Sequence, residues 1–411
     1  MGLLPTLRNP VFWFWGFILV GAVSQLVLGL YSHQSMAVSF IVMAVGFVAL
    51  ARCHLGRWIG VDPLVMAALT ILTVALLAQP WIAPDCARCS GRAIRVLPLL
   101  WLMAFAAHAA YAVFTNVPEW AGRWFKFLSW GGGVLFCLML IELLGDAAVY
   151  RWVANFPANE AVGLSRYNRA ASLLVLAIWS WLGWVLLKPS RSTAAPLLVA
   201  VVLAGLTAVL ALGESTTSLL ALAPGLTALV LAAAAPGWVL LAGTLAQIAV
   251  LAAGPWPWIG WPARLNDSLG RWPVTLWHRF EIWDHGALAA AAQPWFGWGF
   301  SGYREVPKTL APIETYRYFV EAPTHPHNVF LQLWVELGVW GALAGGLVVL
   351  AVARAIWAGP RSARPTGIAT FVATATVAIA AYGAWQASWL AIIGFVMISQ
   401  AAVAAIAAPR S

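Results

Sequence analysis

Two closely spaced histidines are the clearest candidates for chemistry in this sequence. His325 and His327 flank Pro326, and Asn328 follows in the run Thr-His-Pro-His-Asn-Val-Phe-Leu-Gln. A histidine with a pKa near neutral can take a proton from an attacking hydroxyl group. An adjacent asparagine can orient an imidazole ring or bind a sugar hydroxyl. We interpret the motif as a general-base site, with plain loop histidines as the alternative.

A metal site is the other chemistry that two histidines suggest. No carboxylate or cysteine at ligand spacing accompanies them, and the single Cys86-x-x-Cys89 lacks a second pair. The acids Glu281 and Asp284 lie beside Arg279, so we expect them to be salt-bridge partners of that arginine. The sequence therefore predicts no metal and no other cofactor.

Arginines form the second group of candidate residues. Arg279 lies in an aromatic run, followed by the turn Pro-Trp-Phe-Gly-Trp-Gly at 294–299, while Arg166 and Arg169 open a long apolar segment. The planar guanidinium binds phosphate oxygens in bidentate fashion and keeps its charge. We expect these arginines to bind an anionic ligand, with the glycine turn allowing close approach to it. The alternatives are contacts with anionic lipid headgroups and an interfacial tryptophan belt.

Composition predicts the elements that position these residues. Of the 411 residues, 62% are hydrophobic and 9% charged, against roughly 25% charged in soluble domains. Apolar runs of about 18 residues or more, enough to cross a hydrocarbon core of ~30 Å, recur along the chain. The net charge of +9 is dispersed among these runs, which argues against nucleic-acid binding. We predict an all-α polytopic membrane protein of about twelve helices, at 11–30, 36–51, 63–83, 96–116, 127–149, 167–187, 196–212, 217–234, 237–254, 327–353, 366–384 and 388–407.

The expected organisation has three parts. Residues 1–254 carry nine membrane helices, 255–326 form one large polar loop with short interfacial helices, and 327–411 carry three more. Outside the long loop, eleven Lys and Arg residues fall on the side of the N-terminus and six on the other. This bias places the N-terminus in the cytoplasm and the loop outside. Both histidines then lie at the outer membrane surface.

The order of these motifs resembles a known family. An Asn-Arg pair opens a middle span, then come Arg-x-x-x-Trp with Pro-x-x-Gly-x-Gly, and finally His-x-His-Asn-x-x-Leu-Gln-x-x-x-Glu-x-Gly. This order is similar to that of the O-antigen ligase and polymerase superfamily, and most similar to O-antigen ligases, which are GT-C-type membrane glycosyltransferases. The motifs cover about 165–345, and the topology covers the whole chain.

The resemblance implies roles for individual residues. His327, directly before the asparagine, corresponds to the essential loop histidine, and Arg169 and Arg279 to the arginines that engage the donor diphosphate. His325 and Asn328 then make supporting contacts with substrate. Relatives often carry a Ser-Arg pair near 215–218, where this chain has Ser-Thr-Thr-Ser. If an arginine is needed there, the candidates left open are Arg264, Arg271 and Arg166.

The activity implied by the resemblance is transfer of a glycan from undecaprenyl diphosphate to a sugar hydroxyl of lipid A–core. It would take place at the periplasmic face of the bacterial inner membrane, with inversion and without metal, and membrane lipids would surround the protein. The alternatives are an O-antigen polymerase, a protein O-oligosaccharyltransferase and a transporter of lipid-linked glycans. The apolar segments lack the paired broken helices expected of a transporter site at the membrane midplane.

Overall fold

The computed structural model describes residues 10–82, 87–157, 159–187, 195–265, 271, 273–310, 316–319 and 323–408, in which all regular elements are helices. Eleven of the helices are long and apolar enough to cross a membrane. The prediction of an all-α polytopic membrane protein is confirmed. Cys86 lies outside the described residues, and nothing is described of the Cys89 side chain.

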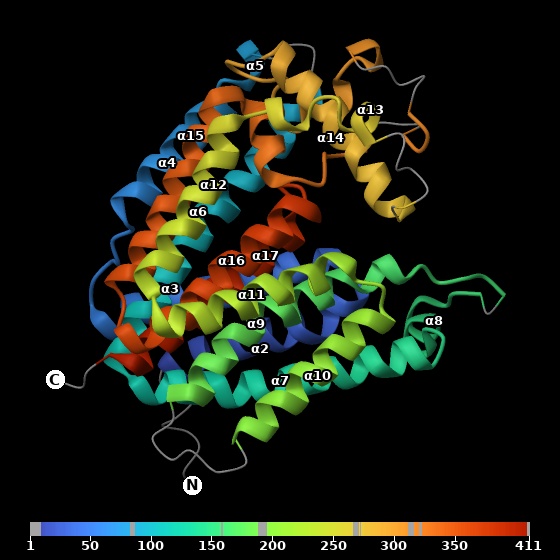
Figure 1. The fold of residues 1–411 in the computed structure, drawn as a ribbon. Coiled ribbons are helices and arrows are strands. Elements are labelled where there is room, and N and C mark those ends of the chain that lie inside the picture. Colours follow the sequence, from blue (N-terminus) through green and yellow to red (C-terminus); the bar gives the residue numbers. More distant parts are fainter. Residues whose placement is uncertain are drawn as a thin grey trace, which may run out of the picture.

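The long helices appear in Figure 1 in the colours of the sequence. They are α2 (Pro10–Tyr31), α3 (His33–Leu55), α6 (Ala87–Asn116), α7 (Pro118–Leu144), α9 (Asn168–Leu187), α10 (Ala195–Leu212), α11 (Thr216–Ala234), α12 (Pro236–Ala253), α15 (Val329–Ala358), α16 (Arg364–Ala380) and α17 (Ala387–Ala407). The shorter ones are α4 (Pro63–Leu77), α5 (Gln79–Ile82), α8 (Ala148–Ala154), α13 (Trp261–Leu265), α14 (Val274–Ala292) and the 3-10 turns η1 (Leu164–Tyr167), η2 (Trp256–Trp258), η4 (Gly302–Glu305), η5 (Lys308–Leu310) and η7 (Arg361–Ala363).

The third predicted membrane helix, 63–83, differs from the others. It is divided at Ala78 into α4 and the single turn α5. The 15 residues of α4 rise about 22 Å at 1.5 Å per residue, which is less than a ~30 Å hydrocarbon core. The apolar run at 63–83 thus gives a short helix and a turn, and the other eleven predicted segments correspond to the eleven long helices.

The bundle is held together by close contacts between helices. The last helix, α17, packs against α3, α6, α7 and α9, while α11 packs against α16. Small residues allow the approach: a Cβ on Gly394 of α17 would lie 2.3 Å from the ring of Phe40, and one on Gly225 would lie 2.4 Å from Trp179. Membrane helices associate through such small-residue contacts because lipid tails provide no hydrophobic drive.

The segment before α15 forms a second apolar cluster. Helix α14 contributes Trp277, Phe280 and Ile282, which pack with Tyr303 and with residues of the first turns of α15. Figure 1 shows α13 and α14 side by side at one end of the molecule, at the upper right. The segment is therefore a folded layer on the bundle, built around a 19-residue helix.

Helix α15 is broken at Gly338, and the break receives the glycine turn. Gly338 has φ 61° and ψ −145°, so the helical hydrogen bonds stop there. The freed groups bond to the turn instead: Trp298 N–H donates to Val335 O at 2.8 Å, and Val339 N–H donates to Pro294 O at 2.9 Å. A Cβ on Gly297 would lie 2.4 Å from the Glu336 carbonyl carbon. The expectation that this turn approaches a ligand is wrong at Gly297, because the close approach is to the backbone of α15.

Candidate functional site

His327 has a backbone and a ring contact that fix its orientation. Its φ of 54° is in the left-handed region, which costs a non-glycine residue about 1 to 3 kcal/mol and concentrates at functional sites. The ring Nδ1 lies 2.9 Å from the carbonyl oxygen of Ala381. A carbonyl only accepts, so Nδ1 carries the proton and the lone pair of the neutral ring is at Nε2. This is the tautomer that a general base requires.

The surroundings keep His327 neutral. Burial lowers its pKa below the usual value, and electrostatic interactions with Arg279 and His278 lower the pKa further, while the bond to Ala381 raises it. The ring is half-buried before the first turn of α15. His327 thus has an unprotonated Nε2 at neutral pH.

His325 is bonded differently. It is 6% exposed, its Nδ1 accepts the His327 backbone N–H at 3.1 Å, and its Nε2 lies 2.8 Å from the side-chain amide of Gln386. Burial lowers its pKa to about 3, with further contributions from His327 and Arg304. Both ring nitrogens have protein partners, so His325 shapes the segment that carries His327.

Asn328 begins α15. Its Oδ1 accepts the backbone N–H of Leu331 at 3.1 Å, which is the usual N-cap bond, worth about 1 kcal/mol. The side chain is fully buried, and its Nδ2 has no partner among the described residues. One half of the amide thus caps the helix, and the other half retains its donor capacity.

Arg279 joins α14 to the head of α11. Its Nη1 donates to Thr217 Oγ1 at 3.2 Å, and burial lowers its pKa, although arginine stays charged at any physiological pH. Thr217 belongs to the Ser-Thr-Thr-Ser run at residues 215–218. The structure therefore brings Arg279 to the head of α11, where the run Ser-Thr-Thr-Ser itself carries no arginine.

Arg169 lies in the first turn of α9 and approaches the segment that contacts His327. It is in electrostatic range of Tyr382 and Arg166. Tyr382 directly follows Ala381, the partner of His327, and its hydroxyl bonds to Asn168 O at 3.2 Å and to Ser172 Oγ at 3.1 Å. The head of α9 and the His327 segment therefore border the same short turn, residues 381–386, which joins α16 to α17.

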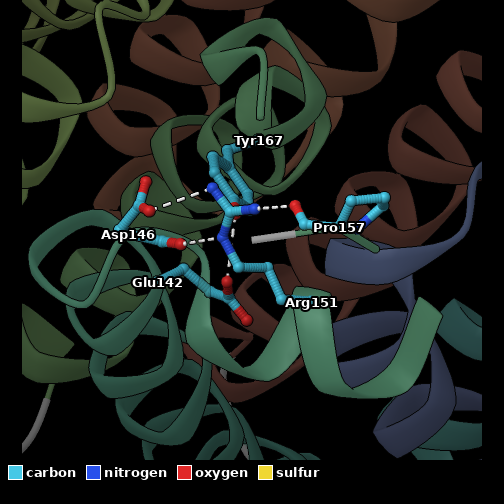
Figure 2. A network of polar contacts seen from close by, with 5 residues as sticks. All are labelled: Glu142, Asp146, Arg151, Pro157 and Tyr167. Atoms are coloured by element: carbon cyan, nitrogen blue, oxygen red, sulfur yellow. Dashed lines mark hydrogen bonds and ion pairs between the residues drawn. The ribbon is translucent and has the colours of Figure 1, made fainter. Parts of the chain in front are cut away.

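Arg166 stacks on Tyr150, and Tyr150 is bonded to an acidic residue that the sequence reasoning missed. Its guanidinium lies 3.9 Å from the centroid of the Tyr150 ring. Buried Glu142, near the end of α7, accepts the Tyr150 backbone N–H at 2.9 Å. It also accepts the Tyr167 hydroxyl at 3.0 Å (Figure 2). An acid inside an otherwise apolar segment is the signal that would have singled out Glu142.

Arg151 lies beside this network and has a structural role. Figure 2 shows its guanidinium between Asp146 and Pro157, with bonds of 2.9 Å to Asp146 Oδ2 and 2.5 Å to Pro157 O. Its Nε also donates to Asp146 O at 2.8 Å. These bonds close the loop around α8, so Arg151 is committed to the protein itself.

Glu281 and Asp284 do not pair with Arg279, so that expectation is wrong. Glu281 accepts the backbone N–H groups of residues 317, 318 and 319 at 2.6 to 2.9 Å and the Trp277 indole at 3.0 Å. Asp284 accepts the Gly260 N–H at 2.6 Å and the Tyr316 hydroxyl at 2.7 Å. The two acids fasten the flanking segments onto α14 because buried carboxylates need several donors.

The remaining arginine candidates differ in position. Arg264 on α13 and Arg271 are exposed, and none of the contacts of the described residues joins either one to His327 or Arg279. Arg304, which sequence reasoning did not single out, is close enough to His325 to lower its pKa. Within the described segments no three His, Cys, Asp or Glu side chains are grouped as metal ligands.

The family comparison covers most of this site. Residues 162–345 match the model of the family described as O-Antigen ligase, a range that includes Arg166, Arg169, Arg279, His325 and His327. A comparison with curated proteins finds no match. The eleven long helices of the described residues are those of a multi-pass membrane protein, and the matched range lies within this protein. The resemblance seen in the sequence is thereby confirmed, and the segment that carries the site is an O-antigen ligase family segment.

Proposed function

We propose that this protein is an O-antigen ligase that transfers a glycan from undecaprenyl diphosphate to a sugar hydroxyl of lipid A–core. The observation that carries the proposal is the His327 geometry: Nδ1 is bonded to a carbonyl, Nε2 has no hydrogen bond within the described residues, and cationic Arg279 lies close by. A deprotonated base beside a half-buried arginine suits attack on a carbon whose leaving group is an anionic diphosphate.

The proposed reaction has one bond-forming and one bond-breaking event at the same carbon. His327 Nε2 takes the proton of the acceptor hydroxyl as its oxygen bonds to the anomeric carbon. The bond from that carbon to the diphosphate oxygen breaks, and the electron pair leaves with undecaprenyl diphosphate. In-line attack inverts the anomeric configuration, and Arg279 and Arg169 stabilise the charge that develops on the diphosphate.

The supporting contacts divide among the other candidates. The free Nδ2 of Asn328 suits a sugar or phosphate oxygen. Arg166 is stacked on Tyr150 and interacts electrostatically with Arg169. It adds to the positive potential that attracts the diphosphate. The exposed side chain of Arg264 suits a peripheral contact with substrate. His325 holds the backbone N–H of His327 and takes no proton in this scheme.

The test is reconstitution with purified components. Detergent-solubilised protein, a purified polyprenyl-diphosphate-linked glycan and lipid A–core should give a ligated product, with and without EDTA. Parallel reactions with donor alone and with an acceptor peptide containing Ser and Thr test a polymerase and a protein glycosyltransferase. Glycan chains growing on donor lipid alone, or product only with peptide, would refute ligation. Loss of product with EDTA and recovery with magnesium would refute the metal-independent scheme.

A further inference from the structure

The turn at residues 381–386 contacts both histidines of the site. Ala381 O bonds to His327 Nδ1, and Gln386 bonds to His325. Gly383 lies so close that a Cβ there would be 2.7 Å from the His325 ring. The position of this turn therefore determines whether a carbonyl is present at His327 Nδ1.

Glu336 holds the turn in place from inside α15. Its carboxylate is fully buried and accepts the Trp385 indole N–H at 2.7 Å and the Gln332 amide at 2.8 Å. The oxygen of the same Gln332 amide accepts the Ala384 N–H at 2.8 Å. Two residues of the turn are thus bonded to Glu336, one directly and one through Gln332.

The opposite side of the carboxylate is fixed by the segment that follows the glycine turn. Ser301 N–H donates to Glu336 Oε2 at 2.5 Å, and the Ser301 hydroxyl accepts Arg92 at 2.7 Å. The three donors to Glu336 come from residues that are far apart in the sequence. The carboxylate lies at the point where the break in α15, η4 and the turn meet.

Only a carboxylate satisfies this set of donors. Glu336 receives three N–H groups and donates none, which matches an ionised carboxyl group. A glutamine would direct its own NH₂ at one of those donors. If Gln332 rotated its amide to compensate, its NH₂ would face the Ala384 N–H. In each arrangement a buried donor loses its acceptor, at a cost of about 1 to 3 kcal/mol.

We propose that Glu336 is a positioning residue for the transfer reaction: it fixes the 381–386 turn so that the Ala381 carbonyl holds Nδ1–H of His327 and leaves Nε2 for the acceptor hydroxyl. The inference rests on the proposed role of His327. It adds a residue that touches no substrate and acts only through the turn. Loss of a carbonyl or carboxylate that orients a functional histidine in this way causes a large loss of activity.

The groups that influence His327 are few. His278 and Arg279 act on it from α14, His325 adjoins it on its own segment, and Tyr382 follows its carbonyl partner in the turn. Glu336 is bonded to none of them. A change at Glu336 therefore reaches His327 through the turn.

The experiment compares three variants of the full-length protein in the transfer assay. Glu336→Gln removes one acceptor, Trp385→Phe removes one donor and keeps an aromatic ring, and Glu214→Gln neutralises an exposed acid as the control. We expect kcat to fall roughly 10- to 100-fold in Glu336→Gln, less in Trp385→Phe, and not in the control. The donor KM should stay within about twofold, because the arginines are untouched.

The pH profile separates positioning from mere support of the fold. Loss of the carbonyl bond removes a contact that favours the imidazolium, so the acid limb of kcat/KM should move to lower pH in both variants. A fall in rate that only follows the amount of folded protein, with an unmoved acid limb, would overturn the inference. Normal activity in both variants would overturn it too. An active His327→Ala protein measured alongside would instead refute the proposed general base.

Discussion

At the scale of single residues, the two histidines of one short motif have different contacts. In the described part of the chain, one ring nitrogen of His327 is bonded to a carbonyl and the other has no hydrogen bond, whereas both nitrogens of His325 have protein partners. The arginines differ in the same way. Arg279 is bonded to Thr217 at the head of α11, whereas the bonds of Arg151 close the loop around α8. Residue type alone does not separate these roles, because the difference lies in the contacts.

The first prediction concerns the histidine pair. His327→Ala should reduce the initial transfer rate by about 10²- to 10⁴-fold, the usual effect of losing a general base. His325→Ala should retain measurable activity but lose about 1 to 3 kcal/mol of stability, because a buried N–H and an amide lose their partner. Initial rates and thermal unfolding in detergent measure both effects. A nearly normal rate in His327→Ala would refute its role as general base. An inactive His325→Ala protein together with an active His327→Ala protein would assign the base to His325 instead.

The second prediction concerns pH. A general base must be unprotonated, so activity is lost as pH falls through the pKa of His327. Burial and the interaction with Arg279 lower that pKa. The acid limb of kcat/KM should therefore lie below pH ~6.5, the value for an unperturbed histidine. A limb above pH 7 would contradict the environment described for His327.

The third prediction concerns Arg279. Arg279→Lys keeps the charge but loses the planar fork, so activity should fall by at least about tenfold while expression persists. Arg361→Lys, an exposed position in η7, is the matched control and should be nearly silent. Equal losses at the two positions would remove any special role for Arg279.

At the scale of elements, the break in α15 is the main device that assembles the site. Gly338 ends one helical segment, the glycine turn bonds to the exposed backbone, and Glu336 then meets Ser301 and Trp385. The same helix begins at the Asn328 cap, one residue after His327. The start and the break of α15 together place the histidines, the turn and the carboxylate around one point.

The fourth prediction tests this break. In Gly338→Ala the new Cβ would lie 2.5 Å from Pro294 O, and φ of 61° disfavours any side chain. The helix break should be destabilised by roughly 1 to 2 kcal/mol or more, lowering the thermal midpoint and the transfer activity together. Gly132→Ala in α7, where a Cβ meets nothing within 4 Å, is the control and should be neutral. A stable and active Gly338→Ala protein would show that the break is dispensable.

At the scale of the whole molecule, the described bundle places the layer around α14 and the heads of α9 and α11 at the same site. Thr217 on α11 bonds to Arg279, and Tyr382 bonds to the head of α9. The distribution of Lys and Arg predicts that this end faces the outside of the membrane. A ligase acting on lipid-linked glycan requires that orientation.

The fifth prediction tests the orientation. In a cysteine-free background, Thr309→Cys, an exposed position in η5, should react with an impermeant maleimide in intact spheroplasts. Arg57→Cys, exposed after α3, should react only after lysis. The reverse pattern would invert the protein in the membrane and refute a site on the outer face.

The class of fold and the chemical candidates can be predicted from the amino-acid sequence alone. Long apolar runs require membrane helices, because only internal hydrogen bonding satisfies the backbone in lipid. The local run of histidines and asparagine also pointed to the segment of residues 162–345 that the family comparison matches. These features are local in the chain, and so they can be read from composition and spacing.

Which side chains and backbone groups contact one another depends on the packing of the folded chain. Ala381 and Glu336 contribute to the site through bonds to residues 49 to 54 positions away, and Thr217 meets Arg279 across 62 positions. Glu281 and Asp284, which are near Arg279 in the sequence, accept backbone N–H groups instead of pairing with it. The reason is that a helix directs neighbouring side chains to different faces. Tautomers, buried acceptors and the partner of each arginine depend on packing across the chain, which local spacing does not encode.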